Sequence, residues 1–162
     1  MSLWKLYKLR IAEVLLLLFL ILYIVWIFRM GSSKDVDMSV IADAITAQCE
    51  LKELSAGDAN ALKQYFSRDA SAYEGYLFYT SESVMNVDQL LIVKTTDSKQ
   101  LEELEDSVNA HLEKQLRNFH GYGTDQEELL QNAVVLERGD YFFYGVSDQV
   151  QQWEDVFLSC IQ

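Results

Sequence analysis

The chain has 162 residues, enough for one ordinary domain, and a formal net charge of −12. Residues 1–34 contain five basic residues and one acidic residue, whereas residues 35–162 contain eight basic and 24 acidic residues, so the two parts carry +4 and −16. A surface this acidic repels nucleic acid and anionic lipid headgroups, which excludes both as partners of the larger part. Proline is absent, so the chain has no proline-rich spacer.

A hydrophobic segment at residues 11–28 dominates the N-terminal part of the chain. It contains one ionisable residue, Glu13, and is apolar without a break from Val14 onward. An α-helix of this length extends about 27 Å, close to the ~30 Å hydrocarbon core of a bilayer. The segment therefore predicts a transmembrane helix whose partner is the lipid bilayer.

The residues that flank this segment predict its orientation. Lys5, Lys8 and Arg10 precede it, and this excess of basic residues favours a cytoplasmic N-terminus. A cleaved signal peptide is the alternative, but Arg29-Met30 stands where a cleavage site needs small residues. We expect a cytoplasmic tail at residues 1–10, a signal anchor at 11–28, a short linker at 29–37 and an exported domain at 38–162.

Hydrophobic periodicity predicts the elements of the exported domain. Apolar residues at helical spacing predict helices near residues 39–49, 61–66, 97–119, 124–130 and 147–161. Apolar, β-branched and aromatic runs predict strands at residues 73–80, 87–96, 133–137 and 141–146. This order predicts an α+β fold with a four-stranded, mainly antiparallel sheet, helices packed on one face and a ββαββα-like core.

Local signals mark several boundaries between these elements. A turn is expected around residues 55–58, and Asp97 is expected to cap the longest helix. Thr124 and Glu127 have the spacing of a capping box. Arg138-Gly139-Asp140 predicts a tight hairpin turn between the last two strands.

Aromatic residues are concentrated in two of the predicted strands. Alternation along a strand sends Tyr76 and Tyr79 to opposite faces of the sheet, and likewise Tyr141 and Tyr144. If helices cover one face only, the other face exposes tyrosines, which either line a partner surface or merely tolerate water. These four residues form the candidate partner surface.

Residues for catalysis or metal binding are scarce. His111 and His120 are nine residues apart without a zinc-ligand pattern, and His111 is expected to be a half-buried packing residue. No nucleophile elbow, phosphate-binding loop or metalloprotease motif occurs, and no cofactor is expected. Cys49 and Cys160 lie in the first and last predicted helices, where they either form a disulfide or serve as small apolar residues.

Four stretches of the chain carry a resemblance to a known family. They are residues 87–94 (VDQLLIVK), the series Leu112, Gln115, Phe119 and Tyr122, the pair Asn132-Ala133, and Gly139-Asp140-Tyr141. Across residues 41–146 the chain resembles small membrane-anchored extracytoplasmic proteins, common in Gram-positive anaerobes, that are classed as a domain of unknown function. The resemblance supplies no activity, and glutamate is frequent in that family where Gln89 stands, which implies no catalytic role for Gln89.

These observations favour a non-catalytic binding or assembly module, anchored in the cell membrane, with another envelope protein as its partner. An envelope enzyme that uses scattered carboxylates is the first alternative. It would need a polar cleft in which two carboxylates of raised pKa converge. A ligand-sensing domain is the second alternative, although a ten-residue tail is too short to signal by itself.

Overall fold

The computed structural model describes residues 16–21, 23, 33–51, 53–121 and 123–162, and divides the chain into two units, Met1–Ser32 and Ser33–Gln162. In the first unit, residues 16–21 are helical and their large apolar side chains are 47–73% exposed. Most of the predicted anchor at 11–28 lies outside the described residues, as do the predicted tail at 1–10 and the start of the linker. No helix within the described residues is both long and apolar enough to cross a membrane.

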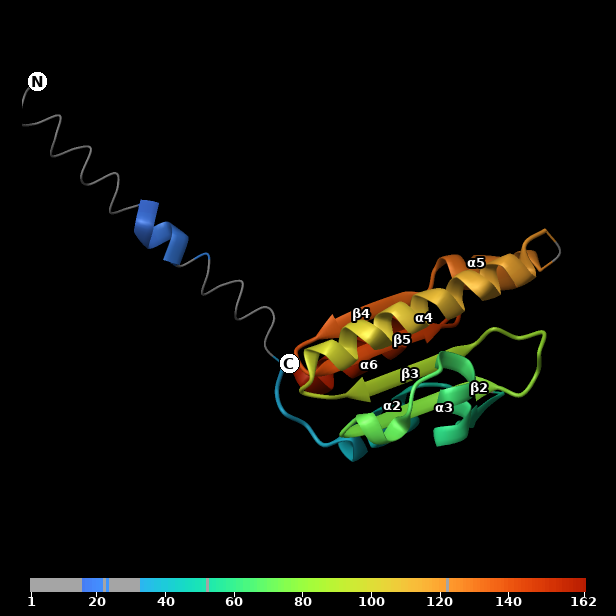
Figure 1. The fold of residues 1–162 in the computed structure, drawn as a ribbon, viewed down its shortest axis with the longest axis horizontal. Coiled ribbons are helices and arrows are strands. Elements are labelled where there is room, and N and C mark those ends of the chain that lie inside the picture. Colours follow the sequence, from blue (N-terminus) through green and yellow to red (C-terminus); the bar gives the residue numbers. More distant parts are fainter. Residues whose placement is uncertain (1–15, 22, 24–32, 52, 122) are drawn as a thin grey trace, which may run out of the picture. The chain divides into compact units, whose positions relative to one another are not determined.

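The second unit is built on an open antiparallel sheet of five strands (Figure 1). Each strand pairs antiparallel with its neighbours, and the order across the sheet is β1-β2-β3-β5-β4. The strands are β1 (Leu54–Ala56), β2 (Gly75–Ser81), β3 (Gln89–Lys94), β4 (Val134–Arg138) and β5 (Tyr141–Val146). The α+β class and the four predicted strands are therefore confirmed, but the predicted count was wrong by one edge strand, β1.

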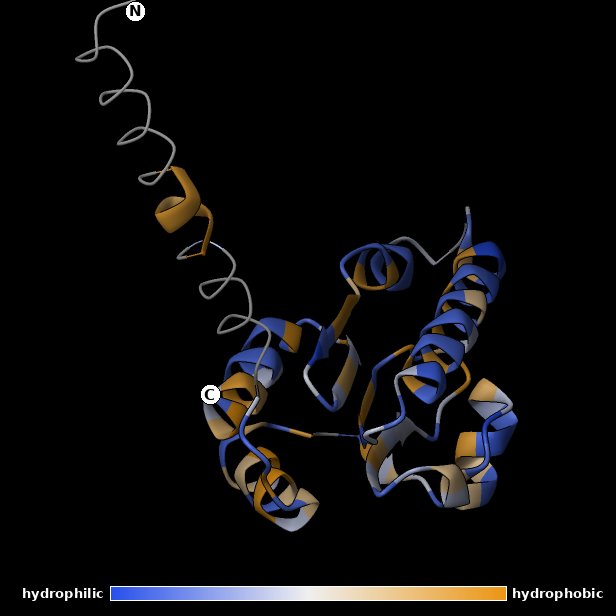
Figure 2. Ribbon diagram, turned by 60° about the vertical axis from the view of Figure 1, so that its left-hand side comes forward, coloured by the Kyte–Doolittle hydropathy of each residue, from blue (hydrophilic) through white to orange (hydrophobic). Residues whose placement is uncertain are grey.

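Helices cover both faces of this sheet, so the prediction of helices on one face only was wrong. One face packs against α3 (Ala59–Phe66), α4 (Ser98–Phe119) and α5 (Thr124–Gln131), and the other against α2 (Met38–Gln48) and α6 (Val150–Ile161). A single 3-10 turn, η1 (Ala70–Ala72), links α3 to β2. Figure 2 shows α4 as mostly hydrophilic with recurring hydrophobic stripes, as expected of a helix with one buried face.

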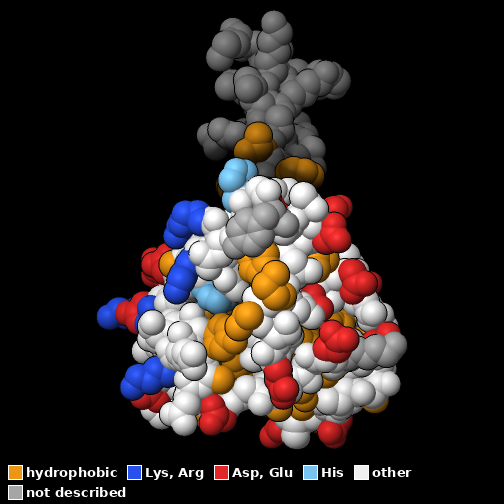
Figure 3. All heavy atoms as spheres, turned by 90° about the vertical axis from the view of Figure 1, so that its right-hand side faces the viewer, with side chains coloured by type: hydrophobic (Ala, Val, Ile, Leu, Met, Phe, Trp, Pro, Cys, Tyr) orange, Lys and Arg blue, Asp and Glu red, His pale blue; other side chains and the backbone are white. Residues whose placement is uncertain are grey.

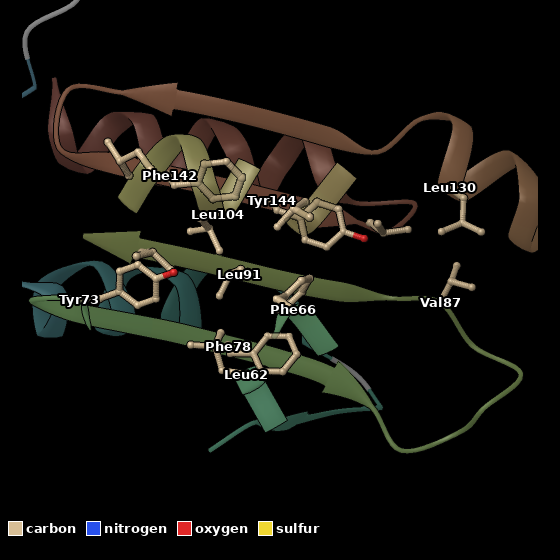
Figure 4. Packing of buried hydrophobic residues seen from close by; sticks show 14 of the residues in the cluster. Leu62, Phe66, Tyr73, Phe78, Val87, Leu91, Leu104, Leu130, Phe142 and Tyr144 are labelled. Atoms are coloured by element: carbon tan, nitrogen blue, oxygen red, sulfur yellow. The ribbon is translucent and has the colours of Figure 1, made fainter. Parts of the chain in front are cut away.

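The central strands explain why both faces are covered. Along β3, Leu91 and Val93 point into the cluster beneath α3 and α4, whereas Leu90 and Ile92 point into the cluster beneath α2 and α6. All four are fully buried. Residues of β5 divide in the same way, and Figure 4 shows Tyr144 near Leu104 and Phe66 in the first cluster. The fold is thus a three-layer helix–sheet–helix domain.

Two of the four predicted boundary signals, the Asp97 cap and the hairpin turn, are confirmed, whereas residues 55–56 of the predicted turn lie in β1. The Asp97 carboxylate accepts a hydrogen bond from the Lys99 amide at 3.0 Å and caps α4. The hairpin turn lies where it was expected, with Gly139 at φ +59° between β4 and β5. The capping box was wrong, because Gly123 is the N-cap of α5 and Glu127 instead bonds back to His120.

Candidate functional site

The four tyrosines predicted as a partner surface do not form one. Tyr141 and Tyr144 are completely buried, and Tyr76 and Tyr79 are half-buried on opposite faces of the sheet. The physical reason is that α2 and α6 cover the face that was expected to be open. The Tyr141 hydroxyl also donates to the Val36 carbonyl at 2.7 Å, so this residue fixes the start of the domain to the sheet.

The exposed apolar residues lie elsewhere, at the turn between β2 and β3. Val84 is 89% exposed and Met85 is 64% exposed. Within the described part of the second unit, the only other exposed large hydrophobic residue is Val40, at 52%. We call Val84 and Met85 the apolar tip. Two adjacent large hydrophobic residues among serines and an asparagine are the sequence signal for this tip.

Hydrogen bonds hold the apolar tip in place. The Ser83 amide donates to the Ser81 hydroxyl at 3.1 Å, and the Asn86 amide donates to the Ser83 carbonyl at 3.1 Å. On the far side of the tip, the Val87 amide donates to the Gln126 side chain of α5 at 2.9 Å. The tip is therefore presented on an ordered turn, which reduces the entropy lost on binding.

A groove runs beside the apolar tip, between the tip, α3 and α4. It consists of two neighbouring hollows of about 430 and 730 Å³. Both hollows are lined by Tyr65, Val84, Gln115 and Asn118. We call them together the α3–α4 groove. Figure 3 looks onto this end of the molecule, where apolar side chains gather along the middle of the surface.

The floor of the α3–α4 groove contains a polar network centred on Gln89, which is 3% exposed. Its amide nitrogen donates to the Thr80 hydroxyl at 3.3 Å, and its Oε1 accepts from the Tyr144 hydroxyl at 3.4 Å. His111 Nε2 lies 3.0 Å from the same oxygen. Because an amide oxygen can only accept, the Nε2 atom of His111 carries the proton.

Burial keeps the His111 ring neutral. The ring is half-buried, as predicted, and contacts the edges of Tyr65 and Phe66 with centroids 5.7 and 5.1 Å away. Loss of solvent around the ring lowers the pKa of His111 to about 4, and the nearby Lys114 ammonium contributes to this lowering. At neutral pH the groove floor is therefore polar but uncharged.

Charge separates to the two sides of the apolar tip. Lys114 lines the groove on the α4 side, whereas Glu53 and Glu82 line a hollow on the β1 side together with Ser83, and Glu82 also borders the groove next to the tip. The Ser55 hydroxyl donates to the Glu82 carboxylate at 2.6 Å and draws it towards β1. Figure 3 shows acidic side chains on one flank of the apolar strip and a mixture of basic and acidic side chains on the other.

The carboxylates with raised pKa values lie apart. Burial raises the pKa of Asp88, which immediately precedes β3, and burial also raises the pKa of Glu137 on β4. Glu137 is paired through Phe142 with Val93, at the far end of β3 from Asp88. The two therefore do not converge on one cleft. Among the described residues, no group of three His, Cys, Asp or Glu could hold a metal ion.

The two cysteines are free thiols. The Gln152 side chain donates to the Gln48 carbonyl at 2.9 Å, so the end of α2 lies beside the start of α6. Burial raises the pKa of the Cys49 thiol, and Cys160 adds a smaller contribution.

The geometry defines a helix–sheet–helix domain with one polar-floored groove and an ordered apolar tip at its rim. Residues 47–147, well over half of the chain, match the family model of a domain of unknown function (DUF4358). The chain therefore belongs to the DUF4358 family, which agrees with the resemblance to a domain of unknown function found in the sequence. No curated protein and no solved structure matches the chain.

Proposed function

We propose that the protein is a membrane-anchored assembly module of the cell envelope. It is a non-catalytic domain that holds a partner protein at the α3–α4 groove through the apolar tip. The observation that carries the proposal is the exposure of Val84 and Met85, 89% and 64%, on a hydrogen-bonded turn. An ordered pair of exposed apolar side chains on so acidic a domain is typical of an anchor that a partner buries.

Membrane attachment rests on residues 11–28. The described part of this segment is helical, and its apolar side chains are about half exposed or more, with Leu16 at 69% and Phe19 at 73%. Such a surface is unfavourable in water and is stabilised by lipid. The basic residues before the segment favour a cytoplasmic N-terminus and an extracytoplasmic domain. Protease added to intact cells should digest residues 33–162, and their survival until lysis would contradict this topology.

A binding role also fits the chemistry of the groove. His111 is neutral and bonded to Gln89, and the two carboxylates of raised pKa, Asp88 before β3 and Glu137 on β4, lie apart. Several side-chain amides line the groove, with Gln64, Gln115 and Asn118 on its walls. Amides both donate and accept hydrogen bonds, so they suit the backbone and side chains of a protein partner.

Site-specific photocrosslinking in living cells tests the proposal. A photoreactive residue at position 84 or 115 of the full-length chain should give a discrete crosslinked protein. The same residue at position 40 is the matched control, because Val40 is also exposed but lies on α2. The substitution Met85→Ser should weaken the crosslink from position 115. Crosslinks that are equally strong at positions 40 and 84 would contradict the proposal.

A further inference from the structure

We propose that the partner docked at the α3–α4 groove is a second copy of this chain, with the apolar tip of each copy seated in the groove of the other. This inference rests on the proposed function and names the partner of the same site. It is based on the order in which apolar, basic and acidic features follow one another across this end of the domain.

That order is acidic side, apolar tip, groove and basic side. Glu53 and Glu82 line a hollow on the β1 side of the tip together with Ser83, and Glu82 also borders the groove. Val84 then lines the groove, and Lys114 lines the same groove from α4. Both members of a complementary pair, tip and groove, are thus presented next to each other on a single copy.

A two-fold axis that passes between the tip and the groove makes this face self-complementary. Rotation by half a turn about the axis exchanges tip and groove, so each tip meets the partner's groove. The same rotation places the acidic β1 side of one copy opposite the basic α4 side of the other. A partner without this symmetry would explain the tip, but not the opposite charges on its two sides.

The charge of the domain makes this the favoured face for self-association. Residues 35–162 carry a net charge of −16, so two copies repel each other at most relative orientations. The part of α4 that lines the groove, residues 107–119, carries Lys114 and Arg117 against one acidic residue, Glu113, which pairs with Arg117 at 3.5 Å. The charges therefore select the orientation, whereas the apolar tip supplies the stabilisation, because exposed ion pairs contribute little.

The groove also suits the occupant that the proposal assigns to it. Methionine is unbranched and polarizable, and it adapts to irregular apolar surfaces such as the Tyr65 ring and the neighbouring Phe119. The floor presents a neutral His111 and the Gln89 amide, whose oxygen and nitrogen already have partners. Inserting an apolar side chain therefore removes no charged group of the floor from water.

Charge-reversed variants of the full-length chain in lipid nanodiscs or detergent provide the test. Lys114→Glu with Arg117→Glu makes both sides of the tip acidic, and Glu53→Lys with Glu82→Lys makes both sides basic. We expect the wild-type chain to dimerise and each double variant to dimerise at least ten-fold more weakly. An equimolar mixture of the two variants should form heterodimers, because an acidic copy then faces a basic one.

Disulfide trapping locates the contact. Two differently tagged chains, one carrying Met85→Cys and the other Gln115→Cys, both with Cys160→Ser, should form a heterodimeric disulfide under mild oxidation. The control pair uses Val40→Cys in place of Met85→Cys and should form none. Monomeric wild-type chain, or mixed charge variants that fail to associate, overturns the inference. A different protein crosslinked at position 84 then leaves the proposed function standing, whereas no crosslink at that position rejects both.

Discussion

Acid should destabilise the domain through His111, and the structure gives the size of the effect. Burial lowers the pKa of His111 to about 4, from 6.5 in an exposed ring. The folded domain therefore disfavours the protonated ring. The stability that depends on a neutral His111 is fully present above pH 6.5 and is lost as the pH falls towards 4. The linkage relation gives a loss of about 2 kcal/mol at pH 5 and about 3 kcal/mol at pH 4.

His111→Phe isolates this effect from the titration of the many carboxylates. Phenylalanine keeps the ring contacts with Tyr65 and Phe66 but does not titrate, and it leaves the Gln89 oxygen with one donor fewer. We expect the variant to be about 1 kcal/mol less stable than the wild type at pH 7.5, because one hydrogen bond is lost. At pH 4 the order should reverse, with the variant about 2 kcal/mol more stable.

Urea unfolding of the wild type and the variant, measured at each pH from 4 to 8, checks this crossover. NMR titration of the His111 ring gives its pKa directly. The matched control is His120→Phe, because His120 is exposed and pairs with Glu127 at the surface. Its stability difference from the wild type should keep its sign over the same range. A His111 ring that titrates near pH 6.5, or variants that unfold in parallel with the wild type at every pH, would refute the reasoning.

Three further substitutions probe the supports of the groove. Gly57→Ala should destabilise the domain by about 1–3 kcal/mol, because the new methyl group would collide with the buried Phe78 ring, and adding Phe78→Leu should recover part of this loss in thermal melts. Asp88→Asn should raise the melting temperature at pH 7, because burial raises the Asp88 pKa and penalises the charged form. This gain in melting temperature should vanish as the pH falls below 4, and a gain that persists there would argue against burial as its cause. Arg68→Ala should lower the free energy of unfolding in urea by about 1 kcal/mol, because Arg68 donates to Glu103 at 2.6 Å and to Ser107 at 2.8 Å. Arg68→Lys should recover less than half of this loss, since one ammonium cannot replace the two donors of the guanidinium group.

The signals that predicted the helices and central strands are local. The cap at Asp97, the glycine at the hairpin turn and the apolar spacing of α4 each depend on a few neighbouring residues. The strand β1 has three residues, Leu54–Ala56, and no pattern of its own. It exists because it pairs with residues 79–81 of β2, a partner more than twenty residues away. Pairing of this kind leaves no periodic signal in the strand itself.

The coverage of both sheet faces was visible in the sequence but was read incompletely. Residues 90–93 (LLIV) and 141–144 (YFFY) are continuous apolar runs, and strands with such runs are usually buried on both sides. Alternation alone suggested an open face with tyrosines, and the continuous runs argued against it. The exposure of the apolar tip could not be predicted in this way. It depends on no other residue covering Val84 and Met85, and that is a property of the folded surface.

The proposed membrane anchoring accounts for the small size of the proposed contact at the apolar tip. A contact made by two apolar side chains and a few exposed charges is weak between molecules that diffuse freely in solution. Two copies anchored in the same bilayer are confined to a thin layer with a limited range of orientations, which raises their effective concentration. Weak self-association then suffices for assembly in the membrane, and residues 33–162 alone should dimerise far more weakly than the anchored chain. The small size of the tip is therefore consistent with a domain that acts only where its anchor holds it.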